Sequence, residues 1–178
     1  MRTPPPGFGA ARERIDAGAS VLTRHLFYLS SVAYASDLVV KETKARSVVC
    51  DRYIVSTLAC HRALGLKSTW DVAELGLVNP DYTFFLQVSD EDVRQRRLNS
   101  RCRITASDKL VDDAALRARM IKEYDQFPCI KVDTTGSTVD EVVEAICRHL
   151  ETDGGLLGKR PLDSETPSRF HRGDVFPS

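Results

Sequence analysis

Hydrophobic residues along the chain fall into short continuous runs and longer periodic stretches. Three runs, residues 47–50, 82–88 and 129–132, are almost wholly apolar and rich in β-branched or aromatic residues. Such runs are typical of parallel strands that are covered on both faces, because neither side of the strand meets water. The pattern therefore predicts three buried parallel strands.

Two stretches between these runs repeat apolar residues at three- and four-residue intervals, as core-facing helices do. The apolar positions are Leu22, Leu26, Leu29, Val32 and Val39 in the first stretch, and Leu116, Met120, Tyr124 and Phe127 in the second. We expect both rows to face a core. Because strands alternate with helices, the predicted fold class is α/β, a three-layer parallel sheet.

Several helix ends are marked in the sequence. Ser89 precedes an acidic first turn and is a predicted N-cap, and Thr138 with Glu141 has the spacing of a capping box before a last amphipathic helix. Gly65 follows the run 56–64 and is a predicted helix C-cap. Residues 153–178 are rich in glycine, proline and charge, so we predict one domain over residues 1–152 and a disordered tail over 153–178.

Composition limits the partners of the chain. Its 178 residues contain 25 Lys+Arg and 25 Asp+Glu, so net charge gives no general attraction to nucleic acid or to an anionic membrane. No apolar run approaches the roughly 20 residues of a membrane span, and the start lacks a secretory signal pattern. We expect a soluble, cytoplasmic protein in which any phosphate contact comes from locally placed arginines.

The cysteines and histidines do not form a metal or disulfide pattern. The 5 cysteines are an odd number without a C-x-x-C pair, and the 4 histidines are scattered. We therefore expect neither a disulfide framework nor a protein-made metal cage, and interpret the cysteines as small buried hydrophobes.

The first candidate for chemistry follows the first predicted strand, where Asp51, Arg52 and Tyr53 are adjacent. In open α/β sheets, ligands bind at the carboxyl ends of the strands. Arg52 could form a bidentate clamp on phosphate, and Asp51 could hold Mg²⁺ through water. The alternative is a structural ion pair at a strand end. When the triplet is considered alone, this alternative is favoured.

The second candidate is an arginine-rich stretch after the strand that begins at Tyr82. It contains Arg94, Arg96, Arg97, Arg101 and Arg103. A run of arginines without interleaved acids suggests a bound anion, and arginine suits phosphoryl oxygens in transfer reactions. A solvated basic helix face explains the stretch equally well. Together the two clusters indicate a site for a polyphosphate.

These residues, in this order, resemble thymidylate kinases and, more closely, mitochondrial-type UMP-CMP kinases. Besides the arginine-rich stretch and the last helix, the matching segments are Thr3-Pro4-Pro5-Pro6, Arg24-His25-Leu26-Phe27-Tyr28, Asp51-Arg52-Tyr53-Ile54-Val55-Ser56-Thr57, Asn79-Pro80-Asp81-Tyr82 and Lys131-Val132-Asp133-Thr134-Thr135. The resemblance covers nearly everything before the tail. It implies transfer of the ATP γ-phosphate to a nucleoside monophosphate, with ATP and Mg²⁺, and is compatible with a homodimer.

The resemblance also implies a role for individual residues. Arg52 would bind the acceptor monophosphate, near the segment from Thr3 to Pro6, and Asp51 would act on the Mg²⁺ side. The substrate-binding residues would be Arg24, Phe27, Tyr28, Tyr53, Ser56, Cys60 and His61, with Phe27 or Tyr28 stacking on the base. Arg97, Arg101 and Arg103 would belong to the lid over the transferring phosphates.

The chain departs from the family in two respects. It contains no Gly-rich loop ending in Gly-Lys-Ser/Thr, so the resemblance predicts a kinase fold without its first strand, phosphate-binding loop and first helix. Residues 1–178 alone should then lack kinase activity, and a nucleotide-binding pseudokinase or interaction module is the alternative. Cys60, His61 and Val32 replace residues usual in thymidylate kinases, so the expected acceptor is a pyrimidine monophosphate such as dTMP, CMP or UMP.

Overall fold

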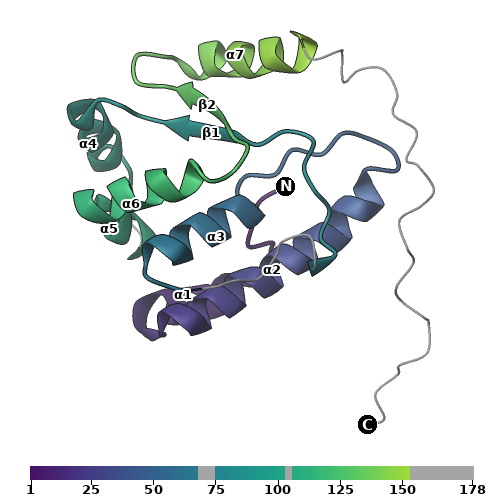
Figure 1. Cartoon of the computed structure of the whole chain (residues 1–178), viewed down its shortest axis with the longest axis vertical. Helices are drawn as coiled ribbons and strands as arrows, with labels where there is room; N and C mark the ends of the chain where they lie inside the picture. The colour runs from purple at the N-terminus through teal and green to yellow at the C-terminus, as the bar shows by residue number, and fades with distance from the viewer. Residues whose placement is uncertain (68–74, 103–105, 153–178) are drawn as a thin grey trace. The chain divides into compact units, whose positions relative to one another are not determined.

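The structure of the chain is a computed structural model that describes residues 1–67, 75–102 and 106–152. It contains two compact units, which divide between Thr138 and Val139 and are described separately. Helices α1 to α6 and both strands belong to the first unit, and α7 (Val139–Thr152) belongs to the second (Figure 1). The domain bounds 1–152 stay a prediction, and the tail predicted for 153–178 lies outside the described residues.

The helices of the first unit account for most of its regular structure. They are α1 (Gly9–Gly18), α2 (Val21–Glu42), α3 (Ile54–Ala63), α4 (Glu91–Asn99), α5 (Ala106–Asp112) and α6 (Ala114–Tyr124). The periodic stretches predicted α2 and α6. Helices α1 and α5 were not predicted, because short polar segments such as GAARERIDAG repeat no apolar row.

The sheet of the described residues has two parallel strands, β1 (Phe84–Gln87) and β2 (Ile130–Asp133). Phe84 pairs with Ile130 and Gln87 with Asp133. Both strands were predicted, so the α/β class with a small parallel sheet is confirmed. The larger, three-layer sheet that was predicted is not confirmed.

The strand predicted over residues 47–50 is wrong. Val49 is 82% exposed, and this segment makes a single parallel bridge, between Arg2 and Asp51. Asp51 N–H donates to the Met1 carbonyl at 2.7 Å, and Thr3 N–H donates to the Asp51 carbonyl at 3.1 Å. Among the described residues these contacts make an isolated bridge and not a ladder, so residues 47–50 form no strand there.

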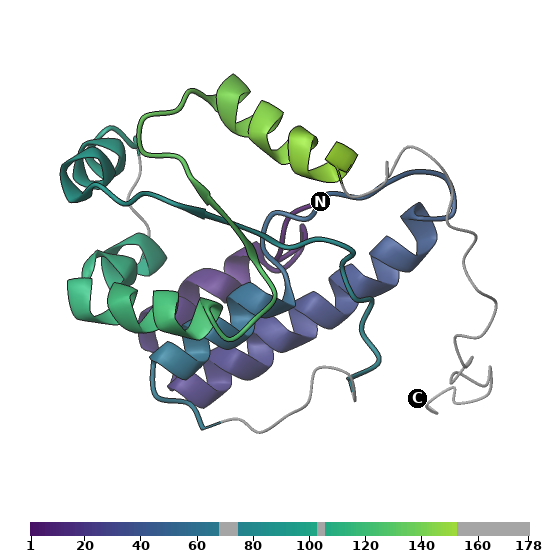
Figure 2. The same cartoon turned by 45° about the horizontal axis from the view of Figure 1, so that its top comes forward.

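The core of the first unit lies between α2 and α3, which run side by side (Figure 2). Val32, Ile54 and Leu58 form its buried cluster. Helix α6 packs on α3, and the Phe85 and Tyr124 rings stack at 4.1 Å between centroids, which ties β1 to α6. The core therefore joins the long helix, the helix after Tyr53 and the sheet.

The predicted buried face of α2 is partly wrong. Val32 and Val39 are buried, but Leu22 is 52% exposed and Leu26 is exposed too. The buried face instead carries His25, Ser31 and Ser36. Because polar residues fill positions on this face, apolar periodicity alone places it incorrectly.

Helix ends agree with the sequence in two places and differ in one. Gly65 follows α3 with φ +91°, and α7 begins directly after Thr138, as predicted. Asp90, not Ser89, caps α4 by accepting from Val93 N–H at 2.9 Å. The Ser89 hydroxyl instead donates to the Asp133 carboxylate at 2.6 Å, linking the ends of the two strands.

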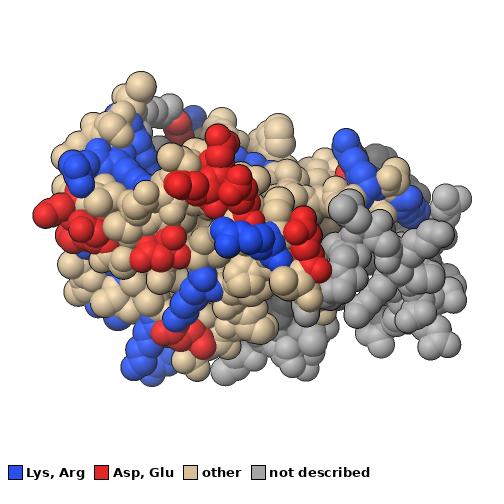
Figure 3. Space-filling model, turned by 90° about the horizontal axis from the view of Figure 1, so that it is seen from above, with Lys and Arg blue, Asp and Glu red and all other residues tan. Residues whose placement is uncertain are grey.

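All 5 cysteines are free. Cys102 and Cys147 are exposed, so the interpretation of all cysteines as buried hydrophobes is wrong for these two. Acidic and basic side chains are interspersed on the face seen in Figure 3. None of the helices in the described ranges combines the length and apolar character needed to cross a membrane.

Candidate functional site

The loop after Thr3 lies beside the Asp51–Arg52 segment. Thr3 is buried, and its hydroxyl donates to the Arg52 carbonyl. The backbone bond from Thr3 to Asp51 holds the same two segments together. Two parts of the chain nearly 50 residues apart therefore form one edge, as the resemblance of both segments implies.

Arg52 has an unusual backbone at this edge. Its φ is +70°, the left-handed region that L-residues other than glycine rarely adopt. Arg52 is exposed and makes no ion pair within the described residues, whereas Asp51 pairs with Arg2 at 3.7 Å between Nε and Oδ2. The structural ion pair considered from the sequence thus involves Asp51 and not Arg52.

Aromatic and imidazole rings from α2 and α3 meet in a cluster, the aromatic wall. The His61 ring lies 5.0 Å from that of His25 and 5.7 Å from that of Tyr28, between centroids. Phe27 meets Tyr28 edge to face at 5.4 Å. His61 Nδ1 lies 2.6 Å from the Thr57 carbonyl of the preceding helical turn, which fixes the imidazole against α3. The structure therefore brings Phe27, Tyr28 and His61 together.

Two arginines direct positive charge at the same wall. Burial raises the pKa of the Cys60 thiol, while the charges of Arg52 and Arg24 act to lower this pKa. Nε of Arg24 is buried and has no hydrogen-bond partner within the described part of the chain. A buried, unused guanidinium donor is costly unless a ligand or water satisfies it.

Sequence reasoning missed a trio that fastens α1 to this wall. Arg12 Nε donates to Tyr28 Oη at 3.1 Å and to Asp16 Oδ2 at 3.3 Å. The Tyr28 hydroxyl donates to the Asp16 carboxylate at 2.9 Å. Phe8, which precedes α1, meets Phe27 edge to face at 5.6 Å. The i,i+4 spacing of Arg12 and Asp16 was the only signal of this trio in the sequence.

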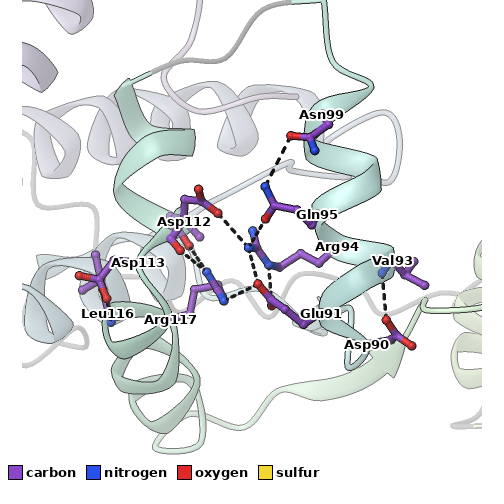
Figure 4. Close-up of polar contacts among 11 residues, drawn as sticks. Asp90, Glu91, Val93, Arg94, Gln95, Asn99, Asp112, Asp113, Leu116 and Arg117 are labelled. Atoms are coloured by element: carbon purple, nitrogen blue, oxygen red, sulfur yellow. Dashed lines mark hydrogen bonds and ion pairs between the residues drawn. The ribbon is translucent and has the colours of Figure 1, made fainter.

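Arg94 of the arginine-rich stretch is neutralised from within the chain. Arg94 bonds the carboxylates of Glu91 at 2.6 Å and Asp112 at 2.8 Å, and Arg117 reaches Glu91 at 2.9 Å (Figure 4). This network joins α4 to α5 and α6. The argument that these arginines need an external anion is therefore wrong for Arg94, because the acids that pair with it lie outside the run of arginines.

The other residues of the predicted lid are placed as follows. Arg97 donates to the Thr134 carbonyl at 2.7 Å and to the Thr134 hydroxyl at 3.1 Å, and Arg101 pairs with Asp108. These contacts, within the described residues, include no member of the aromatic pocket. Arg103 lies outside the described residues. The lid role of all three stays a prediction.

Two other predicted substrate residues lie on α3 or at its start. Tyr53 is the N-cap residue and packs its partly buried side chain against the core cluster, and Ser56 is partly buried in the first turn.

Asp51 is the predicted Mg²⁺ residue. Among the described residues no three His, Cys, Asp or Glu side chains form a metal-binding group. A single exposed carboxylate fits Mg²⁺ only where substrate phosphates supply further ligands.

The His25–His61 pair predicts acid-sensitive stability. Both rings are buried, at 1% and 4% exposure. Burial, then the charges of His61 and Arg62, lower the pKa of His25 to about 4, and burial lowers the pKa of His61. Between this value and the ordinary 6.5 or so, the unfolded chain binds more protons than the folded one, so acid favours unfolding.

We therefore expect the melting temperature to fall as pH drops from about 6.5 towards about 4, and His25→Gln to reduce this dependence. His149→Gln, which replaces an exposed histidine on α7, is the control variant. Thermal melts across this pH range measure the effect. A profile for His25→Gln as steep as that of the parent would contradict it.

Comparison with known proteins identifies the family. The family model described as thymidylate kinase matches residues 1–146. The chain therefore belongs to the thymidylate kinase family, which indicates a nucleoside-monophosphate kinase, a class that uses ATP and Mg²⁺. Comparison with curated proteins and with solved structures gave no match.

Proposed function

We propose that the chain binds a pyrimidine nucleoside monophosphate, such as dTMP, CMP or UMP, as the phosphate acceptor of a cytoplasmic kinase. The observation that carries the proposal is the meeting of the Tyr28 and His61 rings, together with the buried Arg24 Nε that has no hydrogen-bond partner within the described residues. The charges of Arg24 and Arg52 both act on the Cys60 thiol of α3. Aromatic rings suit a base, and guanidinium groups suit a phosphate.

The residues divide into those for the base and those for the phosphate. Phe27 or Tyr28 stacks on the base, and Ser56, Cys60 and His61 line the pocket. Arg52 clamps the monophosphate through parallel N–H groups. Arg97, Arg101 and Arg103 act at the lid. Each role is an expectation taken from the resemblance, and the packing of α2 on α3 supports the roles of the residues on those two helices.

Apart from the lid arginines, no residues of this chain are assigned to the ATP phosphates. Residues 1–178 contain no Gly-x-x-x-x-Gly-Lys-Ser/Thr segment, whose backbone N–H groups would cradle them. Arg52 is assigned to the acceptor phosphate and Asp51 to the Mg²⁺ side, but no described side chains provide the cradle of the donor. A nucleotide-binding pseudokinase or interaction module is accordingly the second candidate.

Sequencing the gene upstream of Met1 and assaying the natural protein distinguish the two candidates. The kinase proposal expects an in-frame Gly-x-x-x-x-Gly-Lys-Ser/Thr segment and ADP formation that depends on a pyrimidine monophosphate in a coupled assay. The pseudokinase expects monophosphate binding without turnover. If neither turnover nor binding of any nucleoside monophosphate is found, the proposed function is wrong.

A further inference from the structure

A hollow of about 330 Å³ lies between the proline loop and the start of α1, and Arg12, which lines it, bonds Tyr28 of the aromatic wall. Residues 4–7 and Gly9 form its walls together with Arg2 and Arg12. No acidic side chain lines it, although Asp51 pairs with Arg2 at its margin. Two guanidinium groups therefore line the hollow, each paired through Nε with a carboxylate outside its lining, Arg2 with Asp51 and Arg12 with Asp16.

The backbone around the hollow adds to its affinity for an anion. Helix α1 begins at Gly9, which lines the hollow, and Phe8 at its N-cap provides no side-chain hydrogen bond. The first N–H groups of an uncapped helix carry partial positive charge and favour anions. This feature acts together with Arg2 and Arg12 at the same place.

Arg12 is held in a fixed orientation while most of its donors stay unused. Both of its hydrogen bonds, to Asp16 and to the Tyr28 hydroxyl, come from Nε. A guanidinium has five N–H donors, so four remain on the two Nη nitrogens. Within the described ranges these nitrogens make no hydrogen bond. An arginine fixed through Nε loses little rotamer freedom when it binds a ligand.

We propose that Arg12 is a second arginine for the phosphate of the acceptor nucleotide, with the hollow beside it as the phosphate subsite. The inference rests on the proposed function and names a residue for it that sequence reasoning missed. Arg12 connects the two parts of the site, because it lines the hollow and bonds Tyr28 of the aromatic wall. On the other side, Thr3 links the proline loop to Arg52.

The test compares ligands with and without a phosphate in wild type, Arg12→Ala, Arg12→Lys and Arg14→Ala. Titration calorimetry with CMP, UMP and dTMP, and NMR titration with inorganic phosphate, measure binding. We expect Arg12→Ala to weaken monophosphate binding by about tenfold to a hundredfold, since each charge-assisted contact contributes on that scale. Binding of the nucleosides cytidine, uridine and thymidine should change little. Arg14, exposed on the same helix, is the matched control.

Arg12→Lys keeps the charge and should restore part of the affinity for phosphate. If Arg12 only positions Tyr28, Arg12→Ala should weaken the binding of nucleosides and of monophosphates by the same factor. This result would overturn the inference. Equal phosphate binding by folded wild type and Arg12→Ala would also overturn it. If wild type binds phosphate through Arg12 but binds no monophosphate, the anion subsite stands and the proposed function fails. If wild type binds neither, both fail.

Discussion

Replacing Leu58 by alanine is expected to lower the free energy of unfolding by about 2–5 kcal/mol. Leu58 is 1% exposed and packs with Val32 and Ile54 between α2 and α3. Truncation removes the transfer free energy of the buried carbons and leaves a cavity that close-packed neighbours fill only in part. The same core holds the pocket wall, since Tyr28 and His61 lie on these two helices.

The matched control for Leu58→Ala is Leu22→Ala, because Leu22 is half exposed on α2. A surface truncation of this kind should change stability by less than about 0.5 kcal/mol. Thermal or urea unfolding measures both variants, and each kcal/mol lowers the melting temperature by roughly 2–4 °C in a unit of this size. If Leu22→Ala were the more damaging change, the predicted leucine row, and not the observed face of α2, would be the core.

Arg52→Ala is expected to weaken binding of a pyrimidine monophosphate by about tenfold to a hundredfold. Arg52 is exposed, its charge acts to lower the pKa of the Cys60 thiol, and its guanidinium can donate two parallel hydrogen bonds to phosphoryl oxygens. Such contacts contribute roughly 1.5–3 kcal/mol, and about 1.4 kcal/mol corresponds to a factor of ten. Arg52→Lys should recover only part of this, because ammonium lacks the planar fork.

The left-handed backbone of Arg52 provides a control that separates function from stability. At φ +70° an L-residue costs about 1–2 kcal/mol, which glycine does not incur. Arg52→Gly should therefore melt no lower than wild type and yet lose monophosphate affinity as Arg52→Ala does. Calorimetric titration and a thermal melt measure the two effects. Unchanged affinity in Arg52→Gly would exclude Arg52 as the phosphate anchor.

The fold was predictable where local pattern and tertiary environment agree. Strands β1 and β2 are apolar runs that do pair with each other, and α2 and α6 carry regular apolar rows. Residues 47–50 have the same local character but join no strand among the described residues, and composition cannot show whether a partner is present. The buried polar residues of α2 show the same limit, because His25 and Ser31 become core residues only through their neighbours.

The site was predictable where sequence motifs identify its residues, and not where it depends on contacts between distant segments. Motif positions identified Phe27, Tyr28 and His61, which the structure does place together. Arg12 was missed because its partner Tyr28 lies 16 residues away on another helix. The arginine-rich stretch looked unneutralised because Asp112, which pairs with Arg94, lies beyond the run, and only the fold brings the two side chains together (Figure 4).

Titration of the folded wild-type chain with a pyrimidine nucleoside monophosphate, and with its nucleoside, tests the central claim most directly. We expect saturable binding of the monophosphate and much weaker binding of the nucleoside. The reason is that Arg24 and Arg52, whose charges act on Cys60, would contact the phosphate and supply much of the affinity. We also expect added salt to weaken binding of the monophosphate more than binding of the nucleoside. Equal affinity for nucleoside and monophosphate, or no binding of either, would contradict the assignment of this pocket as a phosphate-acceptor site.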